Sequence, residues 1–108
     1  MKQYELVFTP EAQQQIAALY AYIALAASPV VAERYTGAIV DYCETLRTSP
    51  LRGTKRNDIR PGLRITNYKG RAVIAFTVEH DRVSIIGVYC GGQDYASDLI
   101  PRIQSAAD

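Results

Sequence analysis

Two closely spaced helix-start signals constrain this chain most. Thr9-Pro10-Glu11 offers a capping hydroxyl, a proline suited to the first helical position and an acid at the positive end of the helix dipole. Ser28-Pro29 repeats the signal after an alanine-rich stretch, and Thr48-Ser49-Pro50 stops the second segment. Each segment spans about 17 residues, or roughly 25 Å at the rise of a helix. Because so few residues connect them, the sequence predicts a long antiparallel helical hairpin that forms one face of the molecule.

Apolar residues recur at helical spacing in both segments, which predicts the faces that the helices bury. In the first segment they are Ala12, Ile16, Leu19, Tyr20, Ile23 and Ala27, and in the second Ala32, Tyr35, Ile39, Tyr42 or Cys43, and Leu46. We expect Cys43 to be a buried core thiol. We expect the rings of Tyr20, Tyr35 and Tyr42 to pack in the core with one edge at water.

Strand patterns flank the hairpin on both sides. A short alternating stretch covers residues 2–8, and apolar stretches rich in branched residues cover 63–68, 72–79 and 82–89. Asn67-Tyr68-Lys69-Gly70 and Glu79-His80-Asp81-Arg82 have tight-turn compositions, so the last three strands should form an antiparallel meander. The sequence predicts an α+β fold: strand, two helices, a three-stranded meander in one sheet, and a short carboxy-terminal tail. The helices should cover one side of the sheet, and something should cover part of the other.

Composition bounds the remaining possibilities. The 108 residues, 48% hydrophobic and 21% charged, suit a single domain over residues 1–108 that needs no disulfide or metal. Cys43, Cys90 and the single His80 have no metal-ligand spacing, and Gly91-Gly92 is no nucleotide-binding loop, so we expect no metal and no cofactor. His80 falls in a turn, which argues against a catalytic role. Without a membrane-length apolar run or signal peptide, the chain reads as a cytoplasmic protein with reduced thiols.

Positive charge is concentrated in the middle of the chain. Residues 47–71, named the basic segment here, hold eight basic residues and one acid, Asp58, for a net charge of +7, whereas the rest carries four basic and ten acidic residues, net −6. The eight are Arg47, Arg52, Lys55, Arg56, Arg60, Arg64, Lys69 and Arg71. Such asymmetry suggests a polyanionic or acidic partner at one face. A solvated loop that maintains solubility is the plain alternative.

A second group of interest lies at strand ends and after the last strand. Tyr68, Tyr89 and Tyr95 are near Arg64, Arg71 and Gln93 in sequence. Aromatic and guanidinium groups together stack bases and bind phosphates, and they also anchor protein interfaces. The residues alone leave both readings open, beside ordinary packing at the ends of a sheet.

The order of these elements resembles the RelE/ParE superfamily of toxins from type II toxin–antitoxin pairs. The resemblance rests on TPEAQQQIAALYAYIA, SPVVAERYTGAIVDYCETLRTSP, RGTKRNDIRPGLR, NYKGRAVIAFTVEHDRVSIIGV and YCGGQDYASDL, which together cover nearly the whole chain. It implies a bacterial toxin with a role in plasmid stabilisation and a cognate antitoxin as partner. We expect that antitoxin to bring an acidic, partly disordered segment that folds along the sheet and hairpin grooves.

Two activities share the fold of this superfamily. RelE-like members are ribosome-dependent endoribonucleases, which need basic groups and an acid/base such as Tyr, His or Glu. ParE-like members have a longer hairpin and inhibit DNA gyrase by binding it. By resemblance, Arg64 matches an arginine at the start of the second strand, and Gln93-Asp94 matches a polar pair after the last one. Tyr89, Gly91 and Gly92 stand where relatives often carry polar or basic groups.

The leading interpretation is therefore a ParE-like gyrase inhibitor without catalytic residues. Its antitoxin- or target-binding residues would be Arg52, Lys55, Arg56, Arg60, Arg64, Arg71, Gln93, Asp94 and Tyr95. The alternative is an endoribonuclease that uses Arg64 with Tyr89 or Tyr95, and only this alternative requires direct nucleic-acid binding. A third reading is a non-toxic member that only binds its antitoxin.

Overall fold

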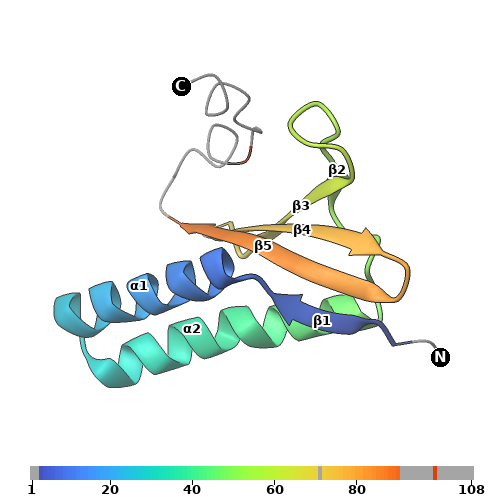
Figure 1. Cartoon of the computed structure of the whole chain (residues 1–108). Coiled ribbons are helices and arrows are strands. Elements are labelled where there is room, and N and C mark those ends of the chain that lie inside the picture. Colours follow the sequence, from blue (N-terminus) through green and yellow to red (C-terminus); the bar gives the residue numbers. More distant parts are fainter. Residues whose placement is uncertain (1–2, 71, 91–98, 100–108) are drawn as a thin grey trace.

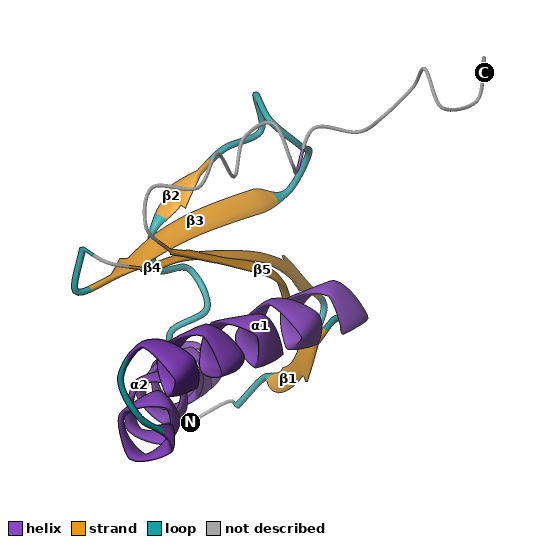
Figure 2. Cartoon of the chain, turned by 90° about the vertical axis from the view of Figure 1, so that its left-hand side faces the viewer, coloured by secondary structure: helices purple, strands orange, loops and turns teal. Residues whose placement is uncertain are grey.

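The computed structural model describes residues 3–70, 72–90 and 99. Strand β1 (Glu5–Phe8) leads into helices α1 (Pro10–Ala26) and α2 (Pro29–Glu44), which ends in a 3-10 turn, η1 (Thr45–Arg47). Strands β2 (Thr54–Lys55), β3 (Leu63–Tyr68), β4 (Ala72–Glu79) and β5 (Arg82–Cys90) follow. The hairpin lies on one side of the sheet and extends past its end (Figures 1 and 2). This is the predicted α+β architecture.

Both helices begin where the sequence predicted. The hydroxyl of Thr9 accepts the N–H of Ala12 at 3.2 Å, and that of Ser28 accepts the N–H of Val31 at 3.1 Å. Each cap satisfies one of the backbone donors that a helix leaves free at its start, and the proline after it has no N–H that would need an acceptor. The 17 residues of α1 and the 16 of α2 confirm the predicted lengths. No helix in the described part of the chain is long and apolar enough to cross a membrane.

The sheet has the order β1-β5-β4-β3-β2. The meander β3–β4–β5 is antiparallel as predicted, with strand bounds that differ from the prediction only at Cys90. Strand β1 pairs in parallel with β5, and it starts at Glu5 rather than at residue 2. The two-residue strand β2, which the sequence did not predict, arises because part of the basic segment pairs with Arg64 and Ile65. At the β3–β4 turn, Lys69 and Gly70 both have positive φ, 53° and 67°, as a tight hairpin requires.

The main core lies between the hairpin and the sheet. Ile39, Cys43 and Leu46 of the α2–η1 segment pack with Ile74 and Phe76 of β4, and all are fully buried. Tyr35 and Tyr42 pack against this cluster, as the sequence predicted. Cys43 is fully buried, which confirms the prediction of a core thiol. Burial raises the pKa of the Cys43 thiol to about 12. Tyr20, in contrast, is 37% exposed, because the hairpin extends past the sheet and Tyr20 lies on that projecting part.

The other face of the sheet, named the distal face, carries a smaller cluster. Leu63, Ile65, Ala75 and Tyr89 are covered there by Ile59 from the basic segment and by Leu99. This confirms the expectation that something covers part of the second face. Arg60 links the two covering residues, because it follows Ile59 in the chain and its Nε donates to the carbonyl oxygen of Leu99 at 3.1 Å.

A β-bulge decides which face Tyr89 occupies. Ala75 pairs with Gly87 and Phe76 with Ile85, so Ile86 is an extra residue in β5. Val83 and Ile85 pack against the helices, and plain alternation would have put Tyr89 on their side. The extra residue shifts the alternation by one and turns Tyr89 to the distal face, where it is 4% exposed.

Candidate functional site

Arg64 of β3 lies on the helix side of the sheet and is bonded to the chain itself. Its register partner is Phe76, whose ring is in the main core, and partners in a ladder share a face. Its Nε donates to the carbonyl oxygen of Arg52 at 3.2 Å and its Nη2 to that of Leu51 at 2.6 Å. Two of its guanidinium nitrogens thus hold the start of the loop that follows η1.

Arg52 is held in the same place by a second set of contacts. Its Nη1 donates to the hydroxyl of Thr45 at 2.7 Å, and its guanidinium lies 5.2 Å from the centre of the Tyr42 ring. Gly53 follows with φ of 83° and passes so close to Ile65 of β3 that a Cβ would clash with its backbone. Only glycine fits there, and the loop is drawn tightly onto the sheet.

Arg56 and Arg47 of the basic segment also bind within the chain. Arg56 makes a two-pronged contact with Asp58, Nε to Oδ1 at 3.0 Å and Nη2 to Oδ2 at 2.9 Å, and this hydrogen bonding lowers the pKa of Asp58. Arg47 lies 3.6 Å from Glu44. Lys55 is exposed on β2. Each described arginine of the basic segment therefore also contacts a group of the chain itself.

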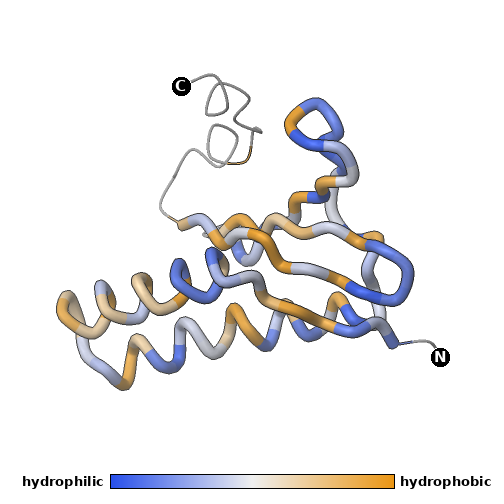
Figure 3. The backbone as a smooth tube through the Cα atoms, viewed as in Figure 1, coloured by the Kyte–Doolittle hydropathy of each residue, from blue (hydrophilic) through white to orange (hydrophobic). Residues whose placement is uncertain are grey.

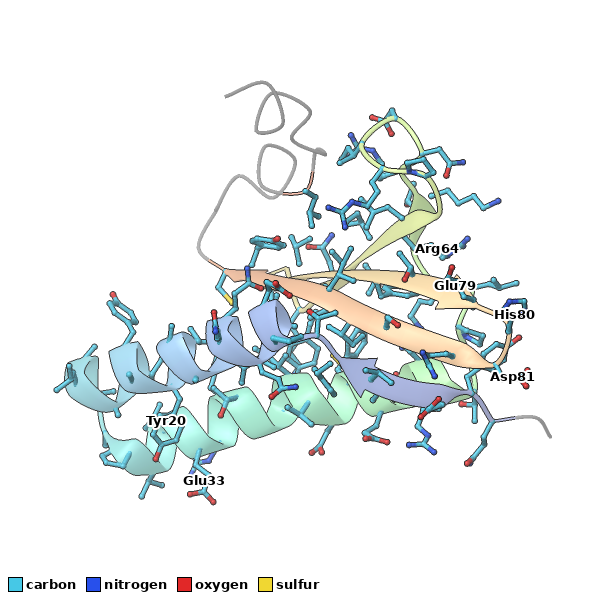
Figure 4. All side chains as sticks on the ribbon, viewed as in Figure 1. Tyr20, Glu33, Arg64, Glu79, His80 and Asp81 are labelled. Atoms are coloured by element: carbon cyan, nitrogen blue, oxygen red, sulfur yellow. The ribbon has the colours of Figure 1, made fainter. Side chains whose placement is uncertain are left out.

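The residues named for a ribonuclease are not brought together in the described part of the chain. Arg64 lies on the helix side of the sheet, whereas Tyr89 is buried on the distal face. His80 is exposed in the β4–β5 turn, as predicted, beside Glu79 and Asp81 (Figure 4). Arg71, Gln93, Asp94 and Tyr95 lie outside the described residues. Within the described residues no three His, Cys, Asp or Glu side chains gather as metal ligands would.

A tyrosine–cation stack joins α2 to the end of β3. The rings of Tyr42 and Tyr68 are 5.1 Å apart at an interplanar angle of 48°, and the Tyr42 hydroxyl hydrogen-bonds that of Thr66 at 2.9 Å. The ammonium of Lys69 lies 5.5 Å from the centre of the Tyr68 ring. Of the tyrosines near strand ends, Tyr68 is thus half-buried against the main core.

A groove opens beside this stack, between α2 and the β3–β4 turn. It has a volume of about 410 Å³ and is named the α2 groove. Its lining residues are Val31, Arg34, Tyr35, Ala38, Tyr68 and Lys69. The sequence did not point to Arg34, which lies off the apolar stripe of α2 and outside the basic segment. Helical spacing does place it one turn before Ala38, but nothing in the sequence brings residue 69 beside it.

The free end of the hairpin carries a third surface. Tyr22, Leu25, Val30 and Val31 are 70%, 91%, 66% and 40% exposed, and they are named the hairpin-end patch. Figure 3 shows apolar residues where the two helices meet, in contrast to the hydrophilic loop before β3. Exposed apolar side chains gathered on a projecting element are typical of protein-binding surfaces.

Comparisons with known proteins agree with this geometry. The family described as "ParE toxin of type II toxin-antitoxin system, parDE" matches residues 6–95. A solved structure titled "Chromosomal ParDE TA system from P. aeruginosa" contains a chain that is 20% identical, with a TM-score of 0.72 over 82% of this chain and 96% of that one. The RelBE2 toxin–antitoxin complex from Mycobacterium tuberculosis contains another, 20% identical, with a TM-score of 0.62 over 86% and 97%. At this identity the likeness concerns the fold. No curated protein matches the chain.

Proposed function

This chain belongs to the ParE toxin family of type II toxin–antitoxin systems, and we propose that it acts by binding and inhibiting DNA gyrase and is neutralised by a cognate antitoxin. The family match and the shared fold confirm the resemblance inferred from the sequence. The superfamily also contains ribonucleases, so the fold does not decide between binding and cleavage. The arrangement of the side chains must therefore decide between binding and RNA cleavage.

The placement of Arg64 and Tyr89 carries the proposal. RNA cleavage needs a cation at the phosphate and an acid/base within hydrogen-bond reach of the same substrate. Arg64 is engaged with the carbonyls of Leu51 and Arg52, and Tyr89 is buried on the opposite face of the sheet. A substrate could reach Tyr89 only after the cover of the distal face had moved away, and it would then lie on the other side of the sheet from Arg64. This favours inhibition by binding.

The hairpin-end patch is the surface that we assign to gyrase. A binding inhibitor needs apolar anchors that are free in the unbound protein, and tyrosine is among the residues that contribute most at interfaces. Tyr22 and Leu25 on α1 and Val30 on α2 meet this requirement, since each is more than half exposed. Because the hairpin projects beyond the sheet, its end can enter a cleft of a much larger protein.

A supercoiling assay with purified gyrase tests the proposal. We expect micromolar toxin to block supercoiling, and Leu25→Asp to weaken the block at least tenfold, since it places a charge at the centre of the patch. Leu51→Asp, at an apolar residue that is 71% exposed but lies off the hairpin, is the matched control and should inhibit like the unaltered protein.

Three results would contradict this function. Supercoiling that proceeds normally at micromolar toxin removes gyrase as the target. Reporter messenger RNA that is cut during translation in the presence of the toxin establishes the endoribonuclease instead. Normal growth when the toxin is expressed without its antitoxin would point to the non-toxic reading.

A further inference from the structure

Helix α1 carries no charge along most of its length, although much of its surface is exposed. The 21 residues from Ala12 to Ala32 include no Asp, Glu, Lys or Arg, whereas α2 carries Glu33, Arg34, Asp41 and Glu44. A helix whose outer side lacks charged residues is ordinarily covered by another element. The solvent-facing side of α1 therefore has the composition of an interface.

The exposed side of α1 is one regular stripe. Gln14, Ala18, Ala21 and Leu25 follow one another at intervals of four, three and four residues, and all four are exposed. They share the side of the helix opposite Ile16, which packs against the main core. The same intervals form the seam along which two helices of a coiled coil meet. This stripe, named the α1 face, runs into the hairpin-end patch at Leu25, which is 91% exposed.

Gln14 is the polar member of the α1 face, and its amide is available. Of its neighbours, Gln13 donates from Nε2 to the carbonyl oxygen of Phe8 at 2.8 Å, and Gln15 accepts the N–H of Val88 at 2.7 Å. Gln14 makes no such contact with any described residue. An amide can donate to the carbonyl oxygens that the end of a helix leaves without intrahelical partners. The last turn of α1 has such carbonyls and no basic side chain.

These features select a second copy of this chain as the occupant of the α1 face. A charged partner surface would lose water there and find no opposite charge, whereas another α1 is itself uncharged. If two copies pack antiparallel about a two-fold axis, Ala18 of one lies beside Ala21 of the other, and Gln14 beside Leu25. The central alanines let the helix axes approach closely, and each Gln14 reaches the carboxyl end of the other α1.

We propose that the α1 face is the interface of a reversible homodimer, and that the dimer covers Leu25 and the adjacent Tyr22 of the hairpin-end patch. A helix face about 25 Å long and about 10 Å wide is smaller than the roughly 800 Å² per partner of a stable interface, so the dimer should exchange with monomer. Only its consequence rests on the proposed function: side chains covered in the dimer cannot contact gyrase, so self-association holds the toxin inactive.

Sedimentation velocity of the purified toxin at increasing concentration tests the interface. We expect the unaltered chain to shift from monomer to dimer. Ala18→Glu should raise the dissociation constant by at least about tenfold, because it adds bulk and like charges where the helices come closest. Ala21→Glu repeats the test one turn along, and both variants place a good helix former at an exposed position. Leu51→Glu, at an exposed apolar residue off the hairpin, is the matched control and should change the constant by less than about twofold.

The supercoiling assay tests the consequence for gyrase. At concentrations where the unaltered toxin is dimeric, Ala18→Glu should inhibit more strongly, because its hairpin-end patch stays uncovered. A toxin that is monomeric up to its solubility limit, or a dimer that both glutamate variants leave unchanged, overturns the α1 interface. Equal inhibition by the dimeric toxin and its monomeric variant overturns the masking of the patch. Since sedimentation is measured without gyrase, a toxin that fails to inhibit gyrase refutes the proposed function and leaves the test of the dimer intact.

Discussion

The two faces of the central sheet are covered in different ways. On the helix side, Ile39 and Leu46 come from a continuous helical segment and pack on Phe76, and all three are fully buried. On the distal face the cover that the described residues provide is Ile59, from a loop, together with Leu99, and Ile59 and Ile65 keep 7% and 8% exposure. A face closed by long periodic elements is fixed by many contacts that form together. On the distal face, the position of the loop that carries Ile59 depends more on single contacts, such as the hydrogen bond from Arg60 to the carbonyl oxygen of Leu99.

The largest expected effect comes from removing the centre of the helix-side core. Phe76→Ala should lower the free energy of unfolding by about 3–5 kcal/mol, because the fully buried ring leaves a cavity between helix and sheet. Ile59→Ala should cost about 2 kcal/mol, the lower end for such truncations, since the loop can settle over the gap. Urea denaturation followed by circular dichroism measures both. Equal losses would mean that the two faces contribute alike and would break the comparison.

A smaller effect is expected at the bulge that separates the faces. A Cβ at Gly87 would lie 2.5 Å from the Tyr89 ring, so Gly87→Ala should displace that ring and cost about 1–3 kcal/mol. The matched control is Gly37→Ala in α2, where a Cβ meets nothing within 4 Å and helix propensity should add about 0.5–1 kcal/mol. Thermal unfolding measures stability, and tyrosine fluorescence reports exposure of Tyr89. A Gly87→Ala protein that is as stable as its parent would show that Tyr89 is not held against the sheet.

The helix-side half of the molecule could be predicted because its signals are local. Thr9 and Ser28 cap the helices as residue-by-residue reasoning requires, and the meander strands follow from apolar stretches and turn residues. The parallel pairing of β1 with β5 could not be predicted, because the residues of a strand do not determine which other strand it pairs with. The face of Tyr89 also escaped prediction: one extra residue, Ile86, reverses it, and the stretch VSIIGVY does not mark where that residue falls.

The sequence predicted where the basic residues of the candidate site are concentrated, but not which way their side chains point. Counting basic residues located the basic segment, but a net charge does not say whether a guanidinium points outward or to a carbonyl of its own loop. Arg64 donates to the carbonyl oxygens of Leu51 and Arg52, and Arg52 donates to the hydroxyl of Thr45. Arg34 and Lys69 are 35 positions apart and meet only because α2 packs beside the β3–β4 turn. Such a groove belongs to the tertiary structure alone.

The smallest expected effect is a pH-dependent loss of stability when the ion pair between Arg56 and Asp58, in the loop that carries Ile59, is removed. Arg56 lowers the pKa of Asp58 below its ordinary value of 3.8 in the folded protein. The carboxylate therefore adds stability at pH values above 3.8, and this contribution is lost as the pH falls through the lower folded pKa. Asp58→Asn should reduce the melting temperature slightly at pH 7, and this difference should shrink as the pH falls below 3.8.

The effect should be small because Asp58 is exposed, and 1 M salt should shrink it further. Asp41→Asn is the matched control, since Asp41 is exposed on α2 and has no cation partner within the described residues. It should show no such pH dependence. If Asp58→Asn still lowers the melting temperature near pH 2, the carboxylate acts through something other than its charge. The loop that carries Ile59 onto the distal face would then be held by its backbone rather than by Arg56.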